Sequence, residues 1–274
     1  SEGRTASQIV SLMELYRGEP LIKSVRPLEL TGSDEAGFSA CGLVVDLGHR
    51  VDTLFASADA SVPRTAPGGF EFAGRFGMVS EQDGKPVNLV LIGGTVLRRN
   101  GVGITTEKAE ERARITAVDR KAGTVTIAAT PPAPQALVGK YVFINNSVRR
   151  VTLQVTAVET TPAGTVLTLD LDPLIGTGLV TGAGADRVLT STPFALRGHR
   201  YYHGARLVSA AGTAEYRLAG VTSAGFALID LQEHPELRQE HLAAAFPNGT
   251  WFEIFDYGVG DELSWPTIVS LSQP

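Results

Sequence analysis

The sequence contains a single cysteine, Cys41, and this scarcity excludes two kinds of architecture. One thiol cannot form an intramolecular disulfide, and it cannot supply a thiolate metal cluster. Cys41 lies in GFSACGLVV, directly before an apolar run, where we expect a small core residue. The stability of the fold must therefore come from packing and hydrogen bonding.

Long hydrophobic runs and an excess of positive charge are also missing. No apolar stretch approaches the length of a membrane helix, and the N-terminus carries no signal-peptide pattern, so we expect no membrane partner. The formal net charge of −5 argues against a nucleic-acid partner, because phosphate contact needs a basic surface. With 274 residues, the chain is long enough to bury a substantial core.

Complete cofactor and metal motifs are absent as well. Val180–Ala185 has half of a dinucleotide fingerprint, but the third glycine is missing and no helical pattern follows. There is no P-loop and no HExxH sequence. Asp256–Glu262 is acidic and rich in glycine, which fits a tight turn, with a calcium loop as the alternative. We therefore expect no cofactor and no metal.

What the chain does contain is period-two alternation of apolar and polar residues. In Val166–Asp172 the apolar side chains fall on one face of a strand and the polar ones on the other. Asp83-Gly84 and Asn100-Gly101 separate apolar runs, and such pairs favour hairpin turns because both central residues need positive φ. The pattern predicts an all-β fold, an antiparallel β-sandwich resembling a supersandwich.

We expect residues 1–274 to form a single sandwich unit. Ile115–Val125 and Val155–Val166 are similar to each other and predict two hairpins of one small sheet, a subdomain at about 112–172. Pro235–Phe246 predicts one short helix near the C-terminus, since Pro suits a first turn and Pro247-Asn248-Gly249 would end it. Residues 9–16 fit either a strand or an amphipathic helix.

The stretch GHRYYHGAR, Gly198–Arg206, is the strongest candidate site. From Arg187 to Arg206 there are four arginines and two histidines but no acidic residue, which gives a local positive field. Arginine binds carboxylates through paired hydrogen bonds, and Tyr or His can move a proton beside a sugar carboxylate. The candidate catalytic residues are Tyr201, Tyr202 and His203. The candidate substrate-binding residues are Arg197, His199, Arg200, Arg206 and Asn145, the last from the polar cluster Asn145–Arg150.

A structural interpretation of the same stretch stays open. Gly198–Arg206 also fits a strand with Tyr201 and His203 on one face and Tyr202 on the other. Its arginines would then be solvated or paired with carboxylates elsewhere in the chain. This second interpretation predicts a binding or structural module without chemistry.

Several stretches resemble the β-sheet region of the heparinase II/III-like polysaccharide lyases. They are Ser11–Val25, Val51–Ser57, Phe70–Phe76, Leu91–Thr95, Val138–Asn146 and Trp251–Asp261. The resemblance spans most of the chain and consists of strand and turn residues. It favours a strand for residues 9–16.

In that family an N-terminal (α/α) toroid supplies most of the catalytic groups, and the β-sandwich closes one side of the cleft. This chain has no run of amphipathic helices, so the resemblance implies the sandwich portion alone, with a catalytic toroid domain or chain as partner. It further implies an acidic, uronate-containing polysaccharide cleaved by β-elimination, a secreted or periplasmic bacterial location, and an isolated chain without activity. It assigns no catalytic residue here, so the candidates above rest on local chemistry.

Overall fold

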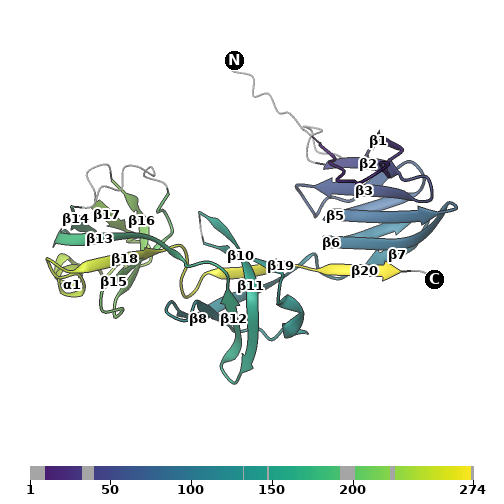
Figure 1. Ribbon diagram of the computed structural model, residues 1–274. Coiled ribbons are helices and arrows are strands. Elements are labelled where there is room, and N and C mark those ends of the chain that lie inside the picture. The colour runs from purple at the N-terminus through teal and green to yellow at the C-terminus, as the bar shows by residue number, and fades with distance from the viewer. Residues whose placement is uncertain are drawn as a thin grey trace, which may run out of the picture. The chain divides into compact units, whose positions relative to one another are not determined.

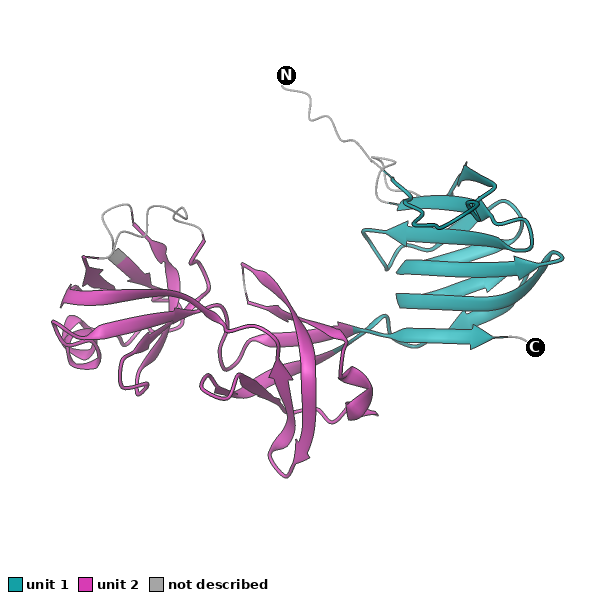
Figure 2. Ribbon diagram, viewed as in Figure 1, with its two compact units in different colours: residues 1–111, 266–274 teal, residues 112–265 magenta. Residues whose placement is uncertain are grey.

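The computed structural model describes residues 10–32, 40–131, 133–146, 148–191, 201–222 and 226–272. The fold is all-β with antiparallel strand pairing and one short helix near the C-terminus, which confirms the predicted fold class. The strands form one open sheet and two closed six-stranded barrels (Figure 1). The sequence pattern predicts a single unit. The structure divides the chain into two compact units, residues 1–111 with 266–274 and residues 112–265 (Figure 2).

The first unit contains an eight-stranded sheet. Its central path runs in the order β1-β2-β3-β5-β6-β20, with β4 paired to β5 and β7 paired to β6 (Figure 1). The strands are β1 (Ser24–Leu28), β2 (Ala40–Asp46), β3 (Val51–Ser57), β4 (Arg64–Ala66), β5 (Phe70–Gln82), β6 (Lys85–Arg99), β7 (Val102–Thr105) and β20 (Ile268–Ser272). Asp83-Gly84 and Asn100-Gly101 form the two predicted hairpin turns, and all four residues have positive φ.

The long β5–β6 hairpin bends back over the sheet at Gly74 and Gly94. A Cβ at Gly94 would lie 2.4 Å from the Ala73 carbonyl oxygen, so only glycine permits the close approach of the two strands. The bend brings the first residues of β5 and the last residues of β6 over the central strands, and one apolar core lies between them. The buried core residues are Phe55, Ala66, Phe70, Phe72, Val79, Leu89, Leu91, Leu97 and Ile104.

The second unit contains both barrels. The first barrel has the strand order β10-β11-β12-β9-β8-β19 and includes the sheet expected at about 112–172. Its elements are β8 (Glu110–Asp119), β9 (Thr124–Ile127), the 3₁₀ helix η1 (Pro134–Leu137), β10 (Tyr141–Asn145), β11 (Arg150–Thr161), β12 (Gly164–Leu169) and β19 (Glu262–Pro266). The two similar segments form the hairpins β8–β9 and β11–β12, and each has a bulge at the same place, after Ile115 and after Val155.

The second barrel has the strand order β13-β14-β17-β16-β15-β18. Its strands are β13 (Leu174–Ala183), β14 (Arg187–Thr190), β15 (Arg206–Ser209), β16 (Glu215–Val221), β17 (Phe226–Ile229) and β18 (Trp251–Phe255). The helix α1 spans Gln239–Ala245, so it begins four residues later than the predicted Pro235. Its Leu242 joins the core of this barrel.

The three sheets are nested along the chain. In the sequence, the strands of the second barrel, β13–β18, come after β12 and before β19 of the first barrel. The strands of the first barrel in turn come after β7 and before β20 of the open sheet. Residues 10–16, for which the family resemblance favoured a strand, belong to no helix or strand. Within the described ranges no helix is long and apolar enough to cross a membrane.

Candidate functional site

The predicted site residues separate into three groups. Arg197, His199 and Arg200 lie outside the described residues. Tyr201, Tyr202 and His203 form a turn that leads into β15, and Arg206 is the first residue of that strand. Asn145 lies on the other barrel of the same unit, at the end of β10.

The turn that contains Tyr202 and Gly204 occurs four times among the described residues of the second unit. Each copy contains a glycine with φ between 78° and 90°, and a strand begins two residues after it. These glycines are Gly139, Gly204, Gly249 and Gly260. The residue after the glycine donates its N–H to the carbonyl three positions earlier, as Ala205 donates to Tyr202. A buried apolar side chain comes two or three residues before the glycine: Leu137, Tyr202, Phe246 or Tyr257.

Each copy of the turn also binds a bulged strand in the same way. The glycine N–H donates to the carbonyl of the residue before the bulge, as Gly204 donates to Leu218 at 2.8 Å. The N–H of the residue before the bulge donates in turn to the carbonyl of the residue after the glycine, as Leu218 donates to Ala205 at 2.8 Å. The corresponding acceptors for Gly139, Gly260 and Gly249 are Val155, Ile115 and Val180. Each barrel therefore consists of two copies of one three-stranded unit.

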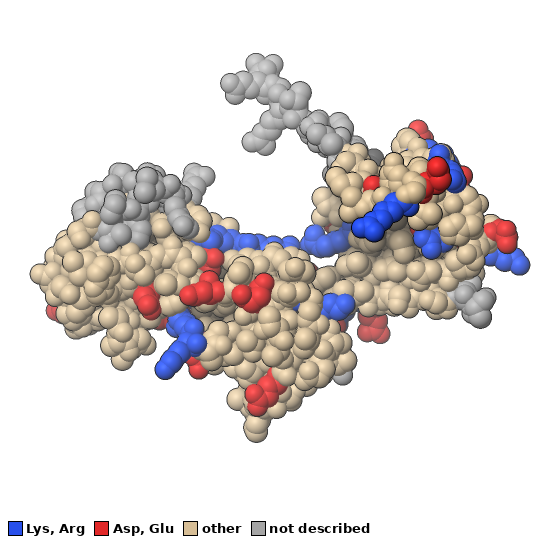
Figure 3. All heavy atoms as spheres, in the orientation of Figure 1, with Lys and Arg blue, Asp and Glu red and all other residues tan. Residues whose placement is uncertain are grey.

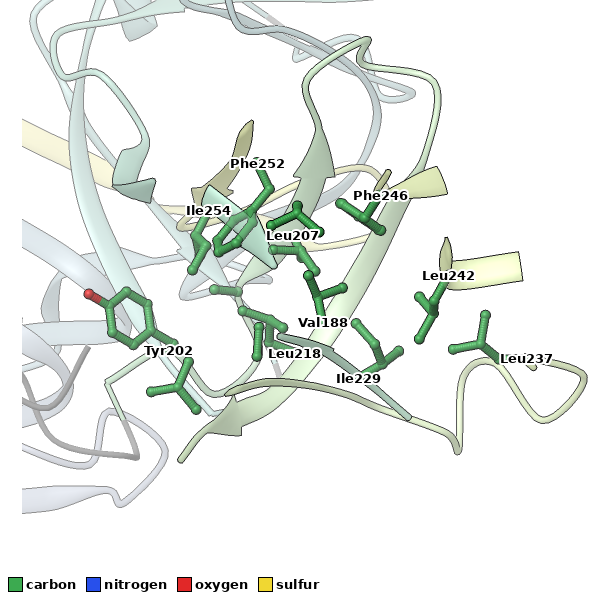
Figure 4. Close-up of a cluster of buried hydrophobic side chains, with 14 residues drawn as sticks. Val188, Tyr202, Leu207, Leu218, Ile229, Leu237, Leu242, Phe246, Phe252 and Ile254 are labelled. Atoms are coloured by element: carbon green, nitrogen blue, oxygen red, sulfur yellow. The ribbon is translucent and has the colours of Figure 1, made fainter. Parts of the chain in front are cut away.

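Tyr202 occupies the anchoring position of this turn. Its side chain is 4% exposed and belongs to the buried cluster of the second barrel with Leu207, Leu218 and Phe252. Figure 4 shows its ring at the margin of the cluster, with the hydroxyl pointing away from the other labelled side chains (Figure 4). Leu137 occupies the same position in another copy of the turn, so the position requires an apolar side chain and no hydroxyl group.

Tyr201 and His203 are both half-buried. The Tyr201 ring meets Tyr202 edge-on, with 5.0 Å between centroids, and the Arg149 guanidinium lies over it at 4.6 Å. Arg149 also donates to the Tyr201 carbonyl and forms an ion pair with Asp256. Burial nevertheless raises the pKa of Asp256 above its ordinary value, since it outweighs the opposing effect of Arg149.

Arg206 is 7% exposed and is held by a buried carboxylate. Its Nη2 donates to Asp261 Oδ1 at 2.8 Å and to the Val259 carbonyl at 3.0 Å. Asp261 is 2% exposed, and its Oδ2 accepts the N–H of Gly258 at 2.8 Å. Asp256–Glu262, where a tight turn or a calcium loop was expected, is therefore a turn whose buried carboxylate accepts hydrogen bonds from the protein itself.

Further charges extend the cluster toward the surface. Arg217 Nη2 donates to the same Asp261 Oδ1 at 3.0 Å, and its Nε is paired with Glu233 at 2.6 Å. Arg120, from the loop after β8, is paired with Glu215 at 2.6 Å. We call these six residues the ion cluster: Arg120, Arg206, Arg217, Glu215, Glu233 and Asp261. Three cations face three carboxylates, so the cluster has no net charge with which to attract an anion or a metal.

Asn145 lies in a different environment, on the outer face of the first barrel. Hydrogen bonds between Ile115 and Asp261, and between Ala109 and Thr267, fix the register of β8 against β19, so that Arg114 lies opposite Glu262. Glu262 is opposite Asn145, and Asn145 is opposite Arg150. The next row runs Arg112, Ser264, Phe143 and Thr152 by the same register. We call these eight residues the outer polar face.

The outer polar face combines cations with an aromatic ring and an amide. The Arg150 guanidinium lies 3.9 Å from the Phe143 ring centroid, and Arg112 is paired with Glu262 at 3.2 Å. Asn145 Nδ2 donates to Ser264 Oγ at 3.4 Å. In Figure 3, basic side chains gather along the edge of the second unit to which β10 and β19 belong (Figure 3). Three arginines and one glutamate leave the face with a net positive charge.

Sequence reasoning found Asn145 and the adjacent Arg149-Arg150 but missed Arg112 and Arg114, which lie far from them in the chain. Their signal is the alternation Arg112-Ala113-Arg114, with Ala113 buried and both arginines exposed. Among the described residues, no group of three or more His, Cys, Asp or Glu side chains could hold a metal ion. Comparisons with protein-family models, curated proteins and solved structures found no match to this chain.

Proposed function

We propose that this chain is the β portion of a heparinase II/III-like polysaccharide lyase, and that it binds uronate-containing polysaccharide through the outer polar face. The observation that carries this proposal is the row Arg150, Asn145, Glu262 and Arg114, which four adjacent strands place on one surface. Guanidinium groups bind carboxylates bidentately, and the Asn145 amide can bond a sugar hydroxyl. The chemistry of such a ligand matches the net charge of the face.

The proposal gives the Tyr201–Arg206 turn a structural role. β-Elimination needs a proton acceptor that reaches the sugar and a cation that stabilises the developing negative charge. Tyr202 is packed in a core, and Arg206 is paired with Asp261. The catalytic groups then come from the helical toroid expected as partner, in a secreted or periplasmic bacterial enzyme, and the isolated chain binds polymer without cleaving it.

The second candidate is a structural module that does not bind glycan. Its support is the four-fold repeated turn, which explains Tyr202 and Gly204 without reference to a ligand. The two candidates differ in one measurable property, the affinity for acidic polymers.

Affinity electrophoresis in gels that contain alginate, heparin or pectin tests the proposal, with neutral dextran as the reference polymer. We expect retardation by at least one acidic polymer, weakening with salt because the contacts are ionic. The double variant Arg114→Gln/Arg150→Gln should bind about tenfold or more weakly, since each charge-assisted contact contributes about 1.5–3 kcal/mol. Arg75→Gln, at an exposed arginine of the first unit, is the matched control and should bind as the parent does.

Each alternative has a distinct result. If the double variant binds as well as the parent, the binding site lies elsewhere on the chain. If the parent binds none of the acidic polymers, the result supports the structural module. Formation of unsaturated uronate by the isolated chain, followed by its ultraviolet absorbance, would overturn the non-catalytic assignment.

A further inference from the structure

The open sheet of the first unit is apolar on both faces. One face carries Phe55, Val79, Leu89 and Leu91, which belong to the buried core. Because side chains alternate along a strand, the neighbouring residues point to the opposite side, and most of them are apolar too. Cys41–Val45 and Leu89–Ile92 read as continuous hydrophobic runs, which is typical of strands buried on both faces.

The strand register aligns these outward residues in rows across six strands. The first row is Cys41, Ala56, Phe76, Ile92 and Ile268, and the second is Pro27, Leu43, Leu54, Met78, Val90 and Ser270. We call these eleven residues the open face. None of them is charged, and none belongs to a buried core cluster of the described chain. Ile268, on the edge strand β20, is 47% exposed.

A third row borders the open face and contains one charged residue. This row is Val25, Val45, Asp52, Ser80, Asn88 and Ser272. Asp52 is paired with Arg50 at 3.0 Å, so its charge is already compensated within the chain. Monomeric proteins seldom expose a contiguous apolar surface of more than a few hundred Å², and a larger one marks an interaction site.

We propose that the open face binds the open face of a second copy of this chain, so that two sheets pack face to face. Six strands at about 4.8 Å spacing and two rows about 7 Å apart cover roughly 400 Å² on each copy. The dimer would bury roughly 800 Å² in total, which is less than a standard specific interface buries, so the proposed association is weak and transient.

Charge and symmetry support a second copy as the partner. A two-fold axis brings the same patch of both copies together, and the eleven uncharged residues then meet no unpaired charge of like sign. Flat sheets pack readily in this way, about 10 Å apart and with their strands roughly 30° from parallel. The packing completes a sandwich whose second sheet comes from the partner copy.

Sedimentation velocity of the full chain over a concentration series tests this proposal. We expect a reversible increase from the 29.0 kDa monomer toward twice that mass. Met78→Lys places a charge in the centre of the open face, next to Val90, and should abolish the dimer. Ile268→Lys, at an exposed edge position where folding is little affected, should weaken it by at least about tenfold. Thr177→Lys, at an exposed strand position of the second unit, should leave it unchanged.

Cys41 provides an independent readout because it is the only thiol and lies in the first row of the open face. We expect its alkylation by a maleimide to slow as the dimer forms and to be fast in Ile268→Lys at the same concentration. Three results would overturn the proposal: a monomer at every concentration, a dimer that both lysine variants leave intact, or a monomer whose Cys41 is protected. The last would mean that the chain itself covers the face.

Discussion

Arg206 and Arg217 lie directly opposite each other on β15 and β16, and both donate to the same oxygen, Oδ1 of Asp261. Like charges at directly opposed positions destabilise a sheet unless an anion compensates them. Asp261 supplies that anion from the turn between the two barrels, 44 and 55 residues away in the chain. The carboxylate thus stabilises the second barrel. It also holds the segment before β19 against that barrel.

Asp261→Asn should lower the free energy of unfolding by about 3–5 kcal/mol, because it leaves two buried guanidinium groups without their shared counterion. Urea denaturation followed by tryptophan fluorescence measures the change. Glu262→Gln is the matched control: it alters a half-exposed carboxylate in the next position and should cost less than about 1 kcal/mol. Equal effects of the two substitutions would contradict the role given to Asp261.

The four turn glycines should respond unequally to alanine. Gly139, Gly249 and Gly260 have no atom within 4 Å of an added Cβ, so alanine there costs only the strain of positive φ, about 1–2 kcal/mol each. Gly204→Ala should cost more, since its Cβ would lie 2.7 Å from Asn146 Oδ1. Thermal unfolding of the four variants gives the order. Gly139→Asn should recover part of the loss, because Asn tolerates this backbone region.

Thr165→Val should leave the protein as stable as the parent or stabilise it by about 1 kcal/mol. Thr165 is fully buried, and within the described part of the chain its hydroxyl has no hydrogen-bond partner. Valine keeps the shape of the side chain and removes the uncompensated polar atom. Thr165→Ala, which removes the methyl group as well, should be destabilising instead. Denaturation midpoints of both variants decide the matter, and a loss of stability in Thr165→Val would contradict the prediction.

The carboxyl group of Asp256 should titrate above its ordinary pKa, because burial outweighs the effect of Arg149. The native state then binds this proton more tightly than the unfolded state does. Its contribution to stability is therefore fully present below the ordinary pKa of Asp and is lost as pH rises through the raised, folded-state pKa. Carbon-detected NMR titration measures the midpoint, which Arg149→Gln should raise further. A midpoint at or below the ordinary value would refute this.

Local features of the fold were predictable from the sequence. Asp83-Gly84 and Asn100-Gly101 determine their own turns, because the positive φ that they adopt is an intrinsic preference of these residues. The likeness of the two hairpins in residues 112–172 reflects a real structural repeat. The helix was placed correctly but begins late, at Gln239, since Pro235 precedes the helix by four residues instead of occupying its first turn.

Barrel closure was not predictable, because it depends on pairs such as Asn145 with Glu262, which are more than 100 residues apart. The counterion of Arg206 was not predictable either, because Asp261 lies 55 residues away in the chain. In the sequence Arg206 lies among basic residues, whereas in the structure it lies beside Asp261. Two of the four three-stranded units are interrupted in the chain by other elements, so their repetition leaves no fixed period in the sequence.

The nested order of the sheets has a consequence for biosynthesis. Strand β20 pairs with β6 only after residues 100–267 have been made, which takes roughly 8–34 s at the usual rates of translation. During that interval the backbone groups of β6 that β20 will later occupy are unpaired on the nascent chain. An unpaired strand edge invites pairing with other chains, so this edge of β6 is prone to mispairing until β20 has been made.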